Sequence, residues 1–362
     1  MKRAWEQHYV LIAVLVGVVI LFSILSPTGF MSWNNIQTLL FQVPEFGLLT
    51  LGMMMVILTG GINLAISSIS ALSGIIAAFV MVKSYLGVGT YATILVAVLA
   101  AMGAAAAMGA MSGYIVAFIG VSPILVTLGM KILLEGVCMR LTKGGSISGY
   151  PEEFYFLGSG AVAKIPVPIL IFAIAAVMTH VLLTRTPWGM KMYMTGSNRT
   201  ASQFSGIDVK KALLQAYVYS SIMAGIASMI MISRYNSAKV TLGSSYLLQS
   251  VSAAVLGGTD MAGGKGSVLG TMIAICIIQV ISNGLNILGT NRFITDAIMG
   301  VILVSVLVLS RLGQIRGSIR PKAAGAGTGA AGAGTGANAG TGTGANAGTG
   351  TGAAGAGIGA ER

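Results

Sequence analysis

The sequence predicts an all-α polytopic membrane protein with about ten transmembrane helices and two internally repeated segments broken by glycine. Of its 362 residues, 55% are hydrophobic and 8% are charged, a composition at which a water-soluble domain would aggregate. Long apolar runs recur from Tyr9 to Arg311. The runs are continuous rather than alternating, which favours helices over the strands of a membrane β-barrel.

The apolar runs divide the chain into candidate spans, because a helix needs about 20 apolar residues to cross the hydrocarbon core. The expected spans, which place a transmembrane domain in residues 1–312, are Val10–Leu25, Ile36–Leu58, Leu64–Val82, Tyr91–Ile119, Pro123–Leu141, Val167–Leu183, Leu213–Ile232, Tyr246–Leu256, Val268–Leu288 and Ile294–Leu309. The eighth is too short to cross alone, so we expect a re-entrant or broken helix there.

The first run resembles a signal peptide, because Lys2 and Arg3 precede it. A turn, Ser26–Gly29, follows it in place of a small-x-small cleavage site. We therefore interpret it as a retained span whose N-terminus lies in the cytosol.

The net charge of +12 would suggest nucleic-acid binding in a soluble protein. Here the cations follow the positive-inside rule instead, so nucleic acid is not an expected partner. If six spans precede Thr184, the N-terminus, the segment Thr184–Lys211 and the basic residues from Arg311 onward all face the cytosol. Both termini are therefore expected to be cytoplasmic.

Residues 313–362 form a tail that is basic at first and then rich in Ala, Gly and Thr. It has too little apolar bulk to pack, so we expect it to be disordered. Gly327–Gly332 matches the dinucleotide pattern G-x-G-x-x-G, but no strand precedes it and no helix follows. The match is therefore assigned no function.

An internal repeat marks two of the expected membrane segments. Gly60–Ala65 (Gly-Gly-Ile-Asn-Leu-Ala) returns as Gly257–Ala262 (Gly-Gly-Thr-Asp-Met-Ala). Glycine-interrupted segments in corresponding halves are typical of transporter cores, where the freed backbone groups face a cavity or protein. Coincidence in a glycine-rich chain is the rival explanation, and the sequence leaves open whether the copies are inverted or parallel.

Thr184–Lys211 is a 28-residue polar excursion with five Lys or Arg residues between two apolar spans. We expect a short helix over Thr200–Ser205 that ends at Gly206. Phe204 and Ile207 would be exposed apolar side chains on this piece. Such a helix suits docking into a groove of a cytosolic partner. The alternative is an interfacial helix that lies on membrane lipid.

Few ionisable side chains lie inside the expected spans, and they suggest neither catalysis nor metal binding. A charge at the bilayer centre costs about 2.5–3.5 kcal/mol, so Glu45 is expected to face a cavity or the outer interface. Lys131 and Glu135 are expected to form a structural i,i+4 pair. Gly258–Ser267 nearly matches a phosphate-binding loop, but its lysine comes one residue late and glycine follows it. We predict no enzyme activity, cofactor or metal, and any ATP would be held by another subunit.

Four stretches together resemble the signatures of permease subunits from bacterial ATP-binding-cassette (ABC) importers of the ribose, xylose, arabinose and galactoside type. They are Val56–Gly74, the cytoplasmic segment Thr195–Lys211, Gly257–Gly270 and Asn283–Gly289. The resemblance extends from about Leu39 to Leu312 and does not include the tail.

The resemblance implies a pair of permease copies, identical or not, in the bacterial cytoplasmic (inner) membrane. It also implies two ATP-binding subunits below them and a periplasmic or lipid-anchored sugar-binding protein above. Residues 184–211 would couple the permease to the ATPase, and the expected contact residues are Gly196, Asn198, Ala201, Phe204, Ser205, Gly206 and Ile207. The chain departs from the family pattern at Asn63, where such permeases usually carry Asp, and at Ala65 and Ser67.

We therefore expect the protein to pass a monosaccharide or similar small polyol, driven by ATP hydrolysis on a partner. A sugar path needs groups that hydrogen-bond hydroxyls, and the candidates are Gln42, Glu45, Asn63, Ser67, Asn283 and Asn286. An ion-coupled secondary transporter of a small polar solute is the alternative, because that class shares repeats and broken helices.

Overall fold

The computed structural model describes residues 2–83, 89–162, 165–291, 294–295, 297–302, 304–305 and 308. The described residues all belong to one compact unit. The expected tail, 313–362, and parts of the expected span Ile294–Leu309 lie outside the described residues.

The named secondary-structure elements of the described residues are helices apart from one short antiparallel hairpin, which confirms the predicted fold class. The hairpin pairs β1 (Ala161–Val162) with β2 (Ile165–Pro166). The helices are α1 (Lys2–Leu25), α2 (Pro27–Phe30), α3 (Trp33–Leu58), α4 (Ile66–Lys83), α5 (Thr90–Tyr114) with a π-helical turn η1 (Ile115–Ile119), α6 (Pro123–Thr142), α7 (Glu152–Ser159), α8 (Val167–Arg185), α9 (Pro187–Ser197), α10 (Arg199–Phe204), α11 (Val209–Tyr235), α12 (Tyr246–Leu256) and α13 (Val268–Ile287).

Five of the described helical stretches are long and apolar enough to cross a membrane: α3, α5 with η1, α8, α11 and α13. Tyr9–Leu25, Ile66–Val82 and Tyr246–Leu256 are shorter apolar stretches. Large apolar side chains such as Leu99 and Ile174 are exposed on the outside of the bundle. In water such a surface would promote association, whereas in a bilayer it contacts lipid.

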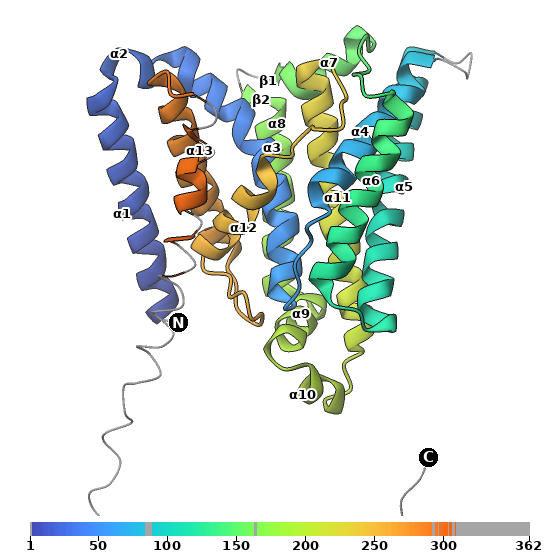
Figure 1. Cartoon of the computed structure of the whole chain (residues 1–362). Coiled ribbons are helices and arrows are strands. Elements are labelled where there is room, and N and C mark those ends of the chain that lie inside the picture. The colour runs from blue at the N-terminus through green and yellow to red at the C-terminus, as the bar shows by residue number, and fades with distance from the viewer. Residues whose placement is uncertain are drawn as a thin grey trace, which may run out of the picture. The chain divides into compact units, whose positions relative to one another are not determined.

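Helices α3 and α11 form the buried centre of the unit, with 78% of the most apolar stretch of each buried. Helix α11 packs against α3, α4, α5 and α7, and Figure 1 shows it inside the bundle, with α1 at one edge and α5 at the other. Ser32, Asp208 and Ser267 cap α3, α11 and α13. Each accepts a hydrogen bond at 3.0–3.3 Å from the backbone N–H three residues on.

Small residues let α5 approach α11 closely. A Cβ atom added to Gly109 would lie 2.8 Å from the carbonyl oxygen of Tyr217, and one on Gly113 would lie 3.1 Å from the Cα of Leu214. Gly103, on the same helix, faces open space. Close contact through small side chains is how helices associate where the hydrophobic effect is absent.

The two glycine breaks lie side by side at the end of the unit that carries α9 and α10 (Figure 1). Helices α3 and α12 run toward this end, and α4 and α13 run back from it. The backbone N–H of Gly264, in the second break, donates a hydrogen bond of 2.8 Å to the carbonyl oxygen of Leu58, which precedes the first. The two copies of the repeat therefore have the same orientation and form one structural feature.

We predict that Gly109→Ala lowers the stability of the protein, because the added methyl group would push α5 away from α11. Overpacking of this kind costs about 1–3 kcal/mol. Thermal unfolding of the purified protein in mild detergent should show a lower Tm. Gly103→Ala is the matched control, since its methyl group meets nothing within 4 Å. Equal Tm values for Gly109→Ala and the wild type would contradict the packing described here.

Candidate functional site

A polar cavity of about 600 Å³ is enclosed by α3, the end of α11, the following loop, α12 and α13. This size lies within the range of about 300–1,000 Å³ that is usual for small-molecule sites. The lining comes from the N-terminal part of α3 and the C-terminal half of α13, so the cavity lies away from α9 and α10 (Figure 1). Amides and a hydroxyl on its wall include Gln42, Gln249, Gln279, Ser282, Asn283 and Asn286.

Helix α13 contributes a polar stripe to the cavity. Gln279, Ser282, Asn283 and Asn286 recur at helical spacing, so they share one face of an otherwise apolar helix. Two amide hydrogen bonds join this face to α3: Nε2 of Gln279 donates to Oε1 of Gln42 at 2.7 Å, and Nδ2 of Asn283 donates to Oδ1 of Asn35 at 2.6 Å. The stripe thus fixes the distance between two cavity walls.

A buried carboxylate lies behind the cavity wall. Glu45 is 0% exposed and pairs with Arg234, with 3.0 Å between its Oε1 and Nη1. Its Oε2 accepts hydrogen bonds from the hydroxyls of Tyr235, at 2.9 Å, and Tyr246, at 3.4 Å. Both tyrosines line the cavity. Glu45 is therefore one side chain removed from the cavity, and its charge is compensated by Arg234 as burial requires.

Asn63 and Ser67 lie elsewhere, at the break between α3 and α4. Oδ1 of Asn63 accepts a hydrogen bond from the backbone N–H of Ala65 at 3.2 Å, and Nδ2 donates to Oγ of Ser220 at 3.1 Å. The amide therefore shapes the turn that starts α4 and joins it to α11. Ser67 is buried, and its hydroxyl has no hydrogen-bond partner within the described residues.

The structure thus brings together three of the six expected path residues, Gln42, Asn283 and Asn286, on one wall. Further residues of the polar cavity wall and of the cluster around Glu45 were not among the expected path residues: Arg234, Tyr235, Tyr246, Gln249, Gln279 and Ser282. The helical spacing on α13 was a signal that could have found Gln279 and Ser282. No local signal connects Arg234 with Glu45, which is 189 residues away.

A packed layer closes the cavity toward α9 and α10. All side chains of α3 from Leu48 to Leu58 are buried, as is α12 from Ser250 to Val255. The hydroxyl of Thr271 on α13 contacts Sδ of Met54 at 3.3 Å within this layer. The described residues therefore place a packed core between the polar cavity and the end that carries α9 and α10.

Three glycine-rich backbone segments meet beyond the packed layer, and we call this meeting point the glycine junction. It consists of Leu58–Gly61, Thr195–Ser197 and Gly263–Gly264. A Cβ atom on Gly196 would overlap the carbonyl oxygen of Leu58, and one on Gly264 would lie 2.6 Å from the Cα of Ser197. Residues with side chains could not approach this closely.

A side-chain hydrogen bond also joins helix α9 to the second glycine break. The hydroxyl of Tyr193 donates a hydrogen bond of 2.9 Å to the carbonyl oxygen of Gly266. Burial raises the pKa of Tyr193, so the group stays a neutral donor at neutral pH. Helix α9 is therefore in direct contact with both glycine breaks.

Helix α10 projects from the same end, as Figure 1 shows. The side chain of Asn198 caps it by accepting a hydrogen bond of 3.0 Å from the backbone N–H of Ala201. Gly206, with φ of 78°, ends it in the left-handed conformation, and Ile207 N–H donates to Ser202 O at 3.0 Å. This pattern is a Schellman motif. It confirms the expected short helix and its stop.

The expected coupling residues divide into an outer and an inner group. Phe204 is 89% exposed, and Ala201, Ser205 and Gly206 are also exposed. Gly196 belongs to the glycine junction, and Asn198 acts as a helix cap. Ile207 is half-buried, which corrects the expectation that it is exposed, because the Schellman motif folds its backbone onto α10.

The segment after α10 has a separate contact with α5. Nζ of Lys210 lies 5.7 Å from the ring centre of Phe118 in η1, and Val209 and Leu213 cluster with Ala117. Asp208 caps α11, and the backbone N–H of Lys211 lowers the pKa of its carboxyl. The polar segment therefore contacts the bundle on two sides.

Helix α6 carries the expected structural pair, with 3.9 Å between Lys131 Nζ and Glu135 Oε1. Oγ of Ser68 on α4 donates to the same Glu135 oxygen at 3.3 Å, so this carboxylate joins two helices. Across the described ranges, no three His, Cys, Asp or Glu side chains come together as a metal site would require.

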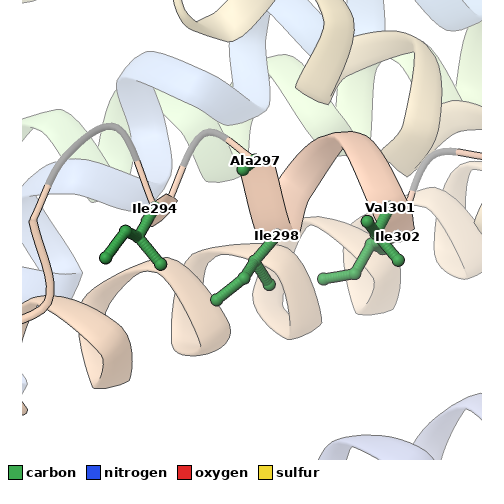
Figure 2. Close-up of a pocket in the computed structure, with 5 residues that line it drawn as sticks. All are labelled: Ile294, Ala297, Ile298, Val301 and Ile302. Carbon is green, nitrogen blue, oxygen red and sulfur yellow. The ribbon is translucent and has the colours of Figure 1, made fainter.

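A second hollow has a different chemistry. It measures about 400 Å³ and is lined, within the described part of the chain, by Ile294, Ala297, Ile298, Val301 and Ile302. Figure 2 shows Ile294 and Ile298 projecting from the same side of this stretch. The aliphatic lining offers no hydrogen bonds to a polar solute, so the polar cavity is the candidate solute site.

Comparison with known proteins places this architecture in a family. The model of the family described as "branched-chain amino acid transport system / permease component" matches residues 35–307. The ribose import permease of Escherichia coli (strain K12) is 36% identical over 311 residues, which cover 84% of this chain and 94% of that protein.

Two further relatives agree with this match. The D-allose transport system permease of Escherichia coli (strain K12) is 31% identical and covers 85% of this chain and 92% of its own. The ribose import permease of Bacillus subtilis (strain 168) is 35% identical, and the match covers 81% of this chain and 89% of that protein. The chain therefore belongs to the branched-chain amino acid transport system permease family, and it is a multi-pass helical transport subunit of the membrane.

Proposed function

We propose that this protein is the membrane permease subunit of a bacterial ABC importer and that it passes a monosaccharide or similar small polyol across the cytoplasmic membrane. Relatives that cover most of the chain are named for import of ribose and transport of D-allose. The polar cavity has the size and the neutral hydrogen-bonding groups that such a solute needs.

The glycine junction is the structural observation that carries the proposal. An importer driven from outside the membrane needs a rigid link between the driven surface and the solute path. Here α9 contacts both glycine breaks, and the helices α3 and α13 that adjoin those breaks also form walls of the cavity. A push on α10 would therefore reach the cavity through backbone contacts rather than through flexible side chains.

The proposed partners follow from the two ends of the unit. Two ATP-binding subunits would dock on the segment 184–211, with Phe204 inserted in a groove as an apolar anchor. A periplasmic or lipid-anchored sugar-binding protein would deliver the solute at the opposite end. A second permease copy, identical or not, and membrane lipid would cover the apolar sides of the transmembrane domain, residues 1–312.

The orientation in the membrane rests on charge. Arg185, Lys191 and Arg199 lie in the segment that includes α9 and α10, and the first residues of α1 lie at the same end in Figure 1. The positive-inside rule places this end in the cytosol. The cavity would then open toward the binding protein.

The ion-coupled alternative receives less support. Proton coupling needs a titratable side chain that is buried but exchangeable. Glu45 is held by Arg234 and two tyrosines, and Glu135 is paired with Lys131. The family membership also favours a subunit that is driven by a partner.

We predict that Phe204→Asp weakens binding of the ATP-binding subunit. The change replaces an 89% exposed aromatic ring with a charge. Loss of a central aromatic anchor costs about 2 kcal/mol or more at a protein interface. Co-purification of the ATPase in mild detergent and ATP-driven sugar uptake should both fall.

Phe156→Asp is the matched control for docking. Phe156 is 56% exposed on α7, at the other end of the unit, so its change should leave co-purification of the ATPase intact. Wild-type uptake by the Phe204→Asp variant would count against docking at α10.

We predict that Gly196→Ala separates docking from transport. The methyl group would overlap the carbonyl oxygen of Leu58 and force α9 away from the glycine junction, while α10 remains exposed. A strain of about 1–3 kcal/mol corresponds to a reduction in uptake of about 5- to 150-fold. The ATPase should still co-purify with the variant.

Gly129→Ala serves as the control, since a methyl group there meets nothing within 4 Å. Unchanged uptake by a correctly assembled Gly196→Ala complex would show that the junction does not transmit movement.

A further inference from the structure

Two tyrosines on the cavity wall are tied to one buried ion pair. Glu45 comes from α3, Arg234 and Tyr235 from the end of α11, and Tyr246 from the start of α12. Both hydroxyls contact the same carboxylate oxygen, and both side chains line the polar cavity. The ring of Phe46 packs 5.7 Å from the ring of Tyr246 and helps to hold its orientation.

The ion pair determines which way the tyrosine protons point. A carboxylate that pairs with a guanidinium is ionised and can only accept hydrogen bonds. The hydroxyl of Tyr235 therefore donates to Glu45, and the single proton of Tyr246 goes either to the same carboxylate oxygen, at 3.4 Å, or to the phenolic oxygen of Tyr235. With their protons used inside the cluster, the phenolic oxygens can offer only lone pairs to the cavity.

We propose that Tyr235 and Tyr246 are specificity-determining residues that accept hydrogen bonds from hydroxyl groups of the passing solute. Glu45 and Arg234 are positioning residues, which fix the direction of those hydrogen bonds without touching the solute. This inference rests on the proposed function and adds to it the chemical feature that the cavity recognises.

The arrangement favours a neutral polyol over an acidic sugar. A sugar hydroxyl can donate to the phenolic oxygens, whereas a carboxylate or phosphate brings acceptors alone. Glu45 and Arg234 cancel in charge, so the cluster adds no net attraction for either sign. Lys239, on the loop after α11, also lines the cavity and would attract an anion. The effect of the tyrosines on uptake therefore has to be measured with neutral solutes.

The experiment uses the complete transporter, with its ATPase and a saturating amount of its binding protein, in liposomes. The probes are D-ribose and D-allose, which are neutral, and the readout is the maximal ATP-driven uptake rate. Saturation with binding protein removes the discrimination that occurs before the permease. Basal ATP hydrolysis and the Tm of the complex are measured in parallel.

Tyr235→Phe and Tyr246→Phe remove the acceptors while they keep the rings. Each should lower the uptake rate about fivefold, the value expected for one hydrogen bond. Tyr150→Phe is the matched control, because its hydroxyl bonds the carbonyl oxygen of Ile147 at 2.7 Å instead of facing the cavity. It should leave the uptake rate unchanged.

The pair Glu45→Gln and Arg234→Gln tests the positioning role. Changing both residues together avoids a buried charge without a partner, which could prevent folding. The amide that replaces the Glu45 carboxylate can donate as well as accept, so the tyrosine protons are no longer fixed. The double variant should lose about as much uptake as the two tyrosine variants do. It should cause no additional loss when both tyrosines are already phenylalanine, since the effects would not be additive.

The possible outcomes distinguish a failure of the proposed function from a failure of the role inferred for the two tyrosines. If the wild-type complex imports neither probe with ATP, the proposed function and this inference fall together. If it imports a probe and the Tyr→Phe variants do so equally well, the inference falls alone. If the double variant lowers uptake as strongly in the phenylalanine background as in the wild type, Glu45 and Arg234 act only on structure and the positioning role is overturned.

Discussion

Hydrogen bonding of the backbone in a medium without water governs this structure. Where a membrane helix breaks, every freed N–H and C=O needs a partner inside the protein. The break after α12 provides a partner for the end of α3, since Gly264 N–H donates to Leu58 O. That solution requires backbones to touch, and glycine at positions 196 and 264 permits it. The repeated glycine breaks and the polar segment 184–211 therefore depend on each other for these close backbone contacts.

The two ends of the unit use different kinds of contact for different tasks. At the glycine junction, backbone atoms contact backbone atoms, which gives a stiff connection with little freedom to rearrange. In the cavity, long amide side chains and tyrosines meet, which gives adaptable hydrogen bonding. Helices α3 and α13 belong to both regions, because α3 extends from Gln42 to Leu58 and α13 from Val268 to Asn286. A rigid helix that is displaced at one end must also move at the other.

The sequence predicted features that depend on local pattern. Apolar length located the helices, and the Gly206 stop located α10. It could not predict contacts between distant residues. Nothing near Glu45 indicates Arg234, which lies beyond the expected end of its span. The close approach of Gly196 to Leu58 and Gly264 depends on two turns elsewhere in the chain. Asn63 and Ser67 are expected on the solute path because an amide and a hydroxyl can hydrogen-bond a sugar, whereas they lie at a helix break and do not line the polar cavity.

The packed layer below the cavity has an energetic consequence for the cell. In the proposed location, the bacterial cytoplasmic membrane, energy is stored as an electrical potential and a proton gradient, and a continuous wet channel would discharge both. Every side chain of Leu48–Leu58 on α3 and of Ser250–Val255 on α12 is buried. A hydrated proton or sodium ion entering there would lose its solvation without compensation. Under the proposed function, opening toward the cytosol would have to be brief and tied to the solute, and the layer would serve as electrical insulation as well as a structural core.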